Sequence, residues 1–265
     1  KMAGRTCTGI AASPFATLQS TVTFVPSTIA SNTVLGASIS FILASQVIVS
    51  ATLTIPAGTT IFALPVPTGV AAPALVVVKG GALVATGSAT MPITFTSVLA
   101  ESALVSSATA STDSNENAIT LGERGKWGGL ILLGNAPTNM PTTTQIEGIT
   151  GYTYGGSNPT ESSGSLQYVR VWHGGAIVGA NNEINGITFG GVGSGTTVAY
   201  CEVAYNADDG FEFFGGTVNV KYLSVLFAGD DAFDTDDGYV GKGQFLFAML
   251  GAVGNHGAEM DSRYA

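Results

Sequence analysis

The first third of the chain is almost without charge. In a sequence of 265 residues, no Asp, Glu, Lys or Arg occurs between Arg5 and Lys79, and the first acidic residue is Glu101. Soluble proteins normally distribute charged side chains over their whole surface. Two explanations stand. Either Ser and Thr supply the polar surface, with or without glycans, or this surface is buried against other copies of the chain, since interface cores are depleted of charge. The second explanation predicts self-association.

Basic residues are scarce throughout. The chain has 9 Lys and Arg against 18 Asp and Glu, and a net charge of −9. Eleven of the acidic residues lie from Glu202 onward, where only Lys221, Lys242 and Arg263 oppose them. Proteins that bind nucleic acids need a basic surface to neutralise phosphates. We therefore expect no nucleic-acid partner.

Cysteine is nearly absent, with Cys7 and Cys201 alone. Two residues exclude a disulfide framework and a zinc pattern of paired cysteines. A single bridge between them remains open. The alternative is that Cys201, which has the strand parity of Val203 and Leu223, points inward as a small apolar residue.

We expect neither a signal peptide nor a membrane span in this sequence. No basic segment followed by an apolar run opens the chain, so we expect a mature or trimmed form. The uncharged run from Val34 to Ile55 is long enough to cross a bilayer. Its serines and β-branched residues favour stacked strands over a helix. We expect no transmembrane segment.

What the sequence does contain is a repeat. Segments 200–212 and 222–234 share Tyr, Val, Asp-Asp and Phe at matching positions, 22 residues apart. A fixed period in this range indicates a solenoid, in which each repeat buries its apolar face against its neighbours. The chain is rich in Ser, Thr, Val and Gly and has no long stretch with helical periodicity, which favours strands.

The repeat also predicts which side chains stack. Parallel strands about 4.8 Å apart place equivalent residues in columns along the solenoid. We predict an inward column of Val171, Val203 and Val225. We predict an outward column of Tyr168, Tyr200 and Tyr222, with Arg170 above Glu202 beside it.

Several motifs resemble a known group of proteins. They are Leu53-Thr-Ile-Pro-Ala-Gly58, Ala74–Val78 followed by Lys79-Gly-Gly81, Trp127-Gly-Gly with Leu133–Thr138, Gln145-Ile-Glu-Gly148, Asn182–Ile187 and Phe213–Asn219. Together they are similar to bacterial secreted and cell-surface proteins, often lipoproteins, built on a right-handed parallel β-helix. The resemblance covers roughly residues 50–262. It implies an all-β solenoid and an extracellular location, and it carries over no catalytic residue.

We accordingly expect two regions. Residues 51–265 should form the right-handed parallel β-helix with long loops. Residues 1–50 carry none of the family motifs and should form an uncharged β segment, suited to assembly or to strand exchange with a neighbouring copy.

The acidic residues of the last repeats are the candidate metal site. Glu212 and Asp234 fall at matching positions, and Glu259-Met-Asp261 continues the series if Met260 takes the place of Phe233. Stacked carboxylates repel unless something neutralises them, and calcium accepts six to eight oxygen ligands. The candidate calcium ligands are Asp208, Asp209, Glu212, Asp230, Asp231, Asp234, Asp236 and Asp237. The alternative is that these residues cap turns through nearby backbone N–H groups.

Aromatic residues are the candidate glycan site. Trp127, Tyr152, Tyr154 and Trp172 are the candidates for a platform on which sugar rings stack. The alternative is that they pack at the edges of coils.

Two functions follow from these features. The first is an extracellular structural or adhesive protein that assembles with itself into a filament or surface layer, because unlike surfaces that meet head to tail need not close on themselves. The second is a calcium-dependent protein that binds or cleaves polysaccharides. The sequence leaves open whether the protein is an enzyme, and it favours the view that it is not.

Overall fold

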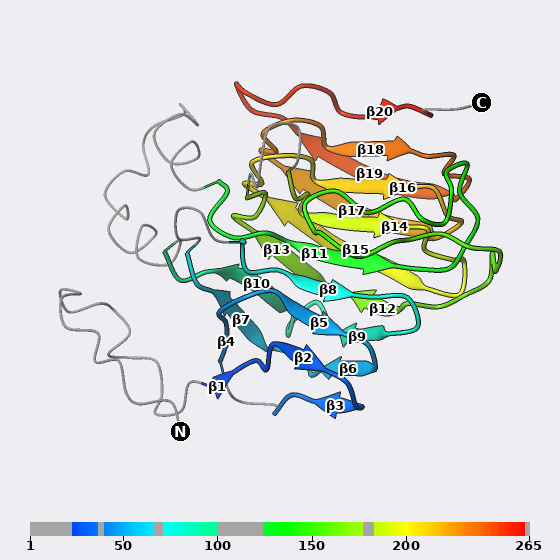
Figure 1. The fold of residues 1–265 in the computed structure, drawn as a ribbon. Helices are drawn as coiled ribbons and strands as arrows, with labels where there is room; N and C mark the ends of the chain where they lie inside the picture. Colours follow the sequence, from blue (N-terminus) through cyan, green and yellow to red (C-terminus); the bar gives the residue numbers. More distant parts are fainter. Residues whose placement is uncertain (1–22, 37–39, 66–70, 100–123, 177–182, 263–265) are drawn as a thin grey trace.

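The computed structural model of the chain is a stack of parallel strands that rises from the N-terminal coil to the C-terminal coil (Figure 1). It describes residues 23–36, 40–65, 71–99, 124–176 and 183–262. All named strand pairs are parallel, and successive coils pair in sequence order. The predicted right-handed parallel β-helix is confirmed.

Each coil contributes to three faces. The first face consists of β2 (Thr28–Ile29), β5 (Val47–Val49), β8 (Leu75–Val77), β11 (Leu130–Leu133), β14 (Ile187–Gly190), β16 (Phe211–Phe214), β18 (Phe233–Asp236) and β20 (Glu259–Met260). The second face begins with β3 (Thr33–Val34), β6 (Thr52–Ile55), β9 (Ala82–Thr86) and β12 (Gly164–Gln167). The third begins with β1 (Thr23–Phe24), β4 (Phe41–Leu43), β7 (Thr60–Ala63), β10 (Ile93–Ser97) and β13 (Val169–Trp172).

In the last coils one long strand serves both the second and the third face. These strands are β15 (Thr197–Ala204), β17 (Asn219–Leu226) and β19 (Gly243–Met249). The first part of β15 pairs with β12 and its second part pairs with β13. A bend within β15 therefore takes the place of the gap that separates β12 from β13 on the preceding coil.

The predicted aromatic column lies at this bend. Tyr168, Tyr200 and Tyr222 have left-handed backbones, with φ of 52°, 57° and 57°. Their rings stack with centroids 4.6 Å apart, and Phe245 extends the column at 4.8 Å. The column is confirmed, but its residues turn the chain between two faces and do not sit on a straight strand. A left-handed non-glycine residue costs about 1–2 kcal/mol, which the stacking of the rings offsets, and Tyr200 and Tyr222 each stack on two neighbours.

The interior column is confirmed as well. Val171 pairs with Val203, which pairs with Val225, and all three are fully buried. Arg170 lies next to Glu202 in register, as predicted. The Glu202 carboxylate accepts a hydrogen bond from Trp172 Nε1 at 2.8 Å, and the Arg170 guanidinium lies 5.7 Å from the Trp172 ring centre.

Cys201 points inward. Its side chain is 1% exposed and it pairs with Leu223 on the next coil. Burial raises the pKa of its thiol to about 12. Cys7 lies outside the described residues, and so does any bridge to it.

Strand pairing runs through the expected boundary at residue 50 without a break. β4 pairs with β7 and β5 pairs with β8, so the strands before residue 51 stack in register on those after it. Leu43, Val47 and Val49 belong to the same buried core as the later coils. Residues 23–36 and 40–49 therefore belong to coils of the solenoid, and the assembly role expected for residues 1–50 stays a prediction.

Candidate functional site

The acidic residues of the last coils gather where turns lead into the first face. Asp208 and Asp209 precede β16, and Asp230 and Asp231 precede β18. Because β16 and β18 pair in parallel, the two turns lie one above the other. The 22-residue repeat thus places the same two carboxylates on neighbouring coils.

A second column of carboxylates runs along the first face itself. Glu212 pairs with Asp234, and Asp234 pairs with Glu259. Met260 pairs with Thr235, so the alignment that placed Met260 at the level of Phe233 is wrong by two residues. Its parity was right, because a shift of two residues keeps a side chain on the same side of the strand.

These residues line one pocket of about 410 Å³, hereafter the acidic pocket. All the residues that line it are acidic: Glu147, Glu183, Asp208, Asp209, Glu212, Asp230, Asp231, Asp234 and Glu259. Within the described part of the chain, no Lys or Arg lines it. In two groups, the carboxylate oxygens lie within 4.8 Å of one another: Asp208, Asp209 and Asp230, and Asp209, Glu212 and Asp234.

Two of the carboxylates cap the next coil. Asp209 Oδ1 accepts a hydrogen bond from the Asp231 backbone N–H at 2.8 Å. Asp231 Oδ1 accepts one from the His256 N–H at 2.5 Å and lies 3.0 Å from the His256 ring Nδ1. Turn capping is therefore correct for Asp209 and Asp231. It is compatible with a bound cation, because a carboxylate has lone pairs for both.

Asn185 fixes two of the pocket's glutamates. Its side-chain amide donates to Glu147 Oε1 at 2.9 Å and also to Glu212 Oε2. Asn185 is 1% exposed, and its Oδ1 is buried with no hydrogen-bond partner among the described residues. A buried oxygen without a donor is costly unless another group satisfies it.

Burial and mutual repulsion disfavour the ionised forms in the acidic pocket. Burial, helped by Glu147 and Glu183, raises the pKa of Asp208 to about 7. Burial, together with Asp208, raises the pKa of Asp209 to about 9. Burial raises the pKa of Glu212 and of Asp234 as well. The protonated forms of these four carboxyl groups are therefore favoured more than they would be in water.

Two predicted calcium ligands, Asp236 and Asp237, do not belong to the acidic pocket. They lie at the far end of β18, where Asp236 Oδ1 accepts the Asp237 N–H at 2.7 Å. The Asp237 carboxylate accepts a hydrogen bond from the Tyr154 hydroxyl. The backbone of Asp237 is left-handed, with φ of 51°, as are those of Gly191 and Gly215 on the preceding coils. These two residues shape a turn, so their inclusion in the calcium site is corrected.

The predicted glycan platform does not assemble. Trp127 is fully buried against Phe95, and its Nε1 donates to the Trp172 carbonyl at 2.8 Å. Tyr154 is 3% exposed and packs on Phe214. Neither ring is available to a ligand, because each is packed within a buried apolar cluster. Tyr152 and Trp172 are half-buried, Tyr152 against the core and Trp172 beside Arg170.

Sequence reasoning missed Glu147, Glu183 and Asn185. They precede the last repeats, in segments that lack the Asp-Asp pattern. Glu147 lies within Gln145–Gly148, and Glu183 and Asn185 lie within Asn182–Ile187. Both segments belong to the motifs that resemble the β-helix family, and their acidic residues are a signal of the site in the sequence.

In the described residues, no helix is both long and apolar enough to cross a membrane. Searches of curated proteins and of solved structures each returned no match. The comparison with protein families matches residues 27–107 and 111–264 to the pectate-lyase like beta helix domain. That match covers most of the sequence and agrees with the observed strand topology. The chain belongs to the family of pectate-lyase-like β-helix domains.

Proposed function

We propose that the protein is an extracellular β-helix protein that binds acidic polysaccharides through calcium held in the acidic pocket. The observation that carries the proposal is the convergence of nine carboxylates on one pocket lined by no basic residue in the described part of the chain. The family match supports a polysaccharide ligand and an extracellular location, both of which are common for pectate-lyase-like domains.

The spacing of the carboxylates suits calcium. Calcium binds oxygen at about 2.3–2.6 Å, so two ligands of one ion lie at most about 5 Å apart. Asp209, Glu212 and Asp234 meet this limit, because their oxygens lie within 4.8 Å of one another. The same is true of Asp208, Asp209 and Asp230. Asn185 Oδ1, buried without a partner beside Glu212, is an additional amide oxygen of the kind that calcium accepts.

The charge of the pocket determines how a polysaccharide would bind. A strongly negative pocket repels a polyanion, whereas a cation held by the pocket attracts the carboxylates of uronate sugars. We therefore expect binding only when calcium is present. The geometry supports binding more than cleavage, because the described residues that line the pocket offer no Lys or Arg as a base.

Titration calorimetry tests the proposal. Calcium is titrated into protein stripped with EDTA, and short oligogalacturonates are then titrated with calcium and with EDTA. Asp234→Asn should lose most of the calcium affinity, whereas Asp261→Asn, an exposed carboxylate outside the pocket, should retain it. If the wild type does not bind calcium, or if the two variants bind calcium with equal affinity, the calcium site is contradicted. If the protein binds calcium but no oligogalacturonate, only the polysaccharide role is contradicted.

Self-assembly is a second candidate, and the exposed apolar side chains of β19 favour it. Every residue of β19 is exposed, including Phe245, Leu246 and Phe247, and β19 pairs only with β17 among the described strands. A second copy that packs against β19 would cover this surface. Light scattering across a wide concentration range should show association, and Phe247→Lys should reduce it. A protein that remains monomeric at high concentration contradicts this role.

A further inference from the structure

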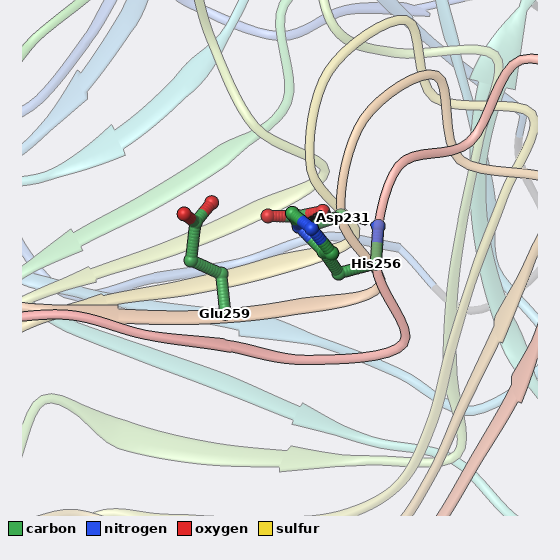
Figure 2. Close-up of side chains that lie close together, drawn as sticks. All are labelled: Asp231, His256 and Glu259. Carbon is green, nitrogen blue, oxygen red and sulfur yellow. Dashed lines mark hydrogen bonds and ion pairs between the residues drawn. The ribbon is translucent and has the colours of Figure 1, made fainter.

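The side chains of Asp231, His256 and Glu259 lie close together (Figure 2), and Asp231 and Glu259 also line the acidic pocket. Asp231 comes from the turn before β18, whereas His256 and Glu259 come from the next coil, with Glu259 in β20. One potential ligand atom from each of the three side chains lies within 4.8 Å of the others. We propose that these residues form a binding site for a divalent transition-metal ion such as Zn²⁺.

The ligand chemistry separates this site from the calcium groups. Those groups offer only oxygen ligands. The new site combines an imidazole nitrogen with two carboxylates, a set that suits zinc and its neighbours, whereas calcium takes oxygen ligands. Three protein ligands leave a position of a tetrahedral zinc ion open for water or for an oxygen of a bound molecule. The inference therefore goes beyond the proposed function and does not depend on it.

The two stacked turns provide an internal comparison. Asp209 accepts the backbone N–H of Asp231, and Asp231 accepts the backbone N–H of His256. Capping alone explains both of these bonds. Only His256 also brings a ring nitrogen back to the carboxylate that caps it, at 3.0 Å. Capping does not require this second contact, and it positions the nitrogen for a metal.

The burial of the site supports a preformed arrangement. The Asp231 side chain is 2% exposed and its orientation is fixed by the His256 N–H, whereas the His256 side chain is 53% exposed. An ion can thus reach the site from solvent and find one ligand already rigid.

Cobalt and zinc titrations test the inference. The visible absorption of Co²⁺ reports nitrogen and oxygen ligands directly, and excess Zn²⁺ should abolish it by displacement. His256→Gln should weaken Co²⁺ binding at least about tenfold, as should Glu259→Gln. Asp261→Asn, near the same strand but outside the group, is the matched control. Circular dichroism confirms that each variant is folded.

The outcomes separate the two sites. Co²⁺ binding that requires His256, in a variant whose calcium affinity is unchanged, establishes the site. Wild-type protein that binds neither Co²⁺ nor Zn²⁺ overturns it, and so does a His256→Gln variant that binds Co²⁺ as tightly as the wild type. Loss of calcium binding in Asp234→Asn with Co²⁺ binding retained bears on the proposed function alone.

Discussion

The ring of Tyr200 lies nearly parallel to that of Tyr222, with an interplanar angle of 8° and centroids 4.6 Å apart. Both residues have left-handed backbones, a conformation that favours glycine. The stacked rings and the bend of the chain therefore occur at the same positions. Aromatic stacking stabilises a turn that the backbone alone disfavours.

This relationship predicts an unusual order of stability at position 200. Tyr200→Ala loses the stacking and keeps the left-handed strain, whereas Tyr200→Gly loses the stacking and relieves the strain. Both variants should be less stable than the wild type, and the glycine variant should be more stable than the alanine variant by about 1 kcal/mol. Denaturant unfolding monitored by circular dichroism measures the difference. An alanine variant at least as stable as the glycine variant contradicts the role assigned to the bend.

The acidic pocket predicts a stability that falls as pH rises. Burial, helped by Asp208, raises the pKa of Asp209 from 3.8 to about 9 in the folded protein. The folded state therefore holds a proton that the unfolded state loses near pH 4. The contribution of protonated Asp209 to the free energy of unfolding is complete below about pH 4 and is lost progressively as pH rises to about 9.

Unfolding midpoints between pH 4 and pH 9 check this dependence. In EDTA the midpoint should decline, and calcium should reduce the decline because it neutralises the ionised carboxylates. Asp209→Asn removes one of the titrating groups and should flatten the EDTA curve. A midpoint in EDTA that rises steadily over this range is the opposite of the expected result.

Cys201 should be inert in the folded protein. Its thiol is buried, and burial raises its pKa to about 12, so little thiolate forms near neutral pH. In a Cys7→Ser background, a thiol reagent at pH 8 should leave Cys201 unlabelled until denaturant is added. Rapid labelling of the folded variant, measured by intact mass, would show that Cys201 is accessible.

The repeat explains why the fold and most of the residues that line the acidic pocket could be predicted. A 22-residue period places Val203 over Val225 and Asp209 near Asp231, because parallel strands in register preserve sequence offsets as positions in space. Residues 22 positions apart could therefore be assigned to the same column even though the loops between the strands were unknown. The alignment of Met260 failed because the last coil differs in length: Asp231 caps His256, 25 residues later.

The rest of the site could not be predicted, because it depends on contacts with segments outside the 22-residue repeat. Glu147 and Glu183 reach the acidic pocket from segments outside the repeat, and Asn185 connects Glu147 to Glu212. Trp127 turns into the core, although its sequence neighbours are polar and glycine-rich. Asp236 and Asp237 share the composition of the acidic turns, but they lie at the other end of the strand. Composition indicated the chemistry, and only the fold determined which end of each strand carries it.

A crystal structure grown with calcium tests the central claim most directly, with the ion located by its anomalous scattering. We predict an anomalous peak among Asp209, Glu212 and Asp234, with metal–oxygen distances of about 2.3–2.6 Å. The same three carboxylates hydrogen-bonded to one another in saturating calcium, with no anomalous peak in the acidic pocket, would contradict the proposal.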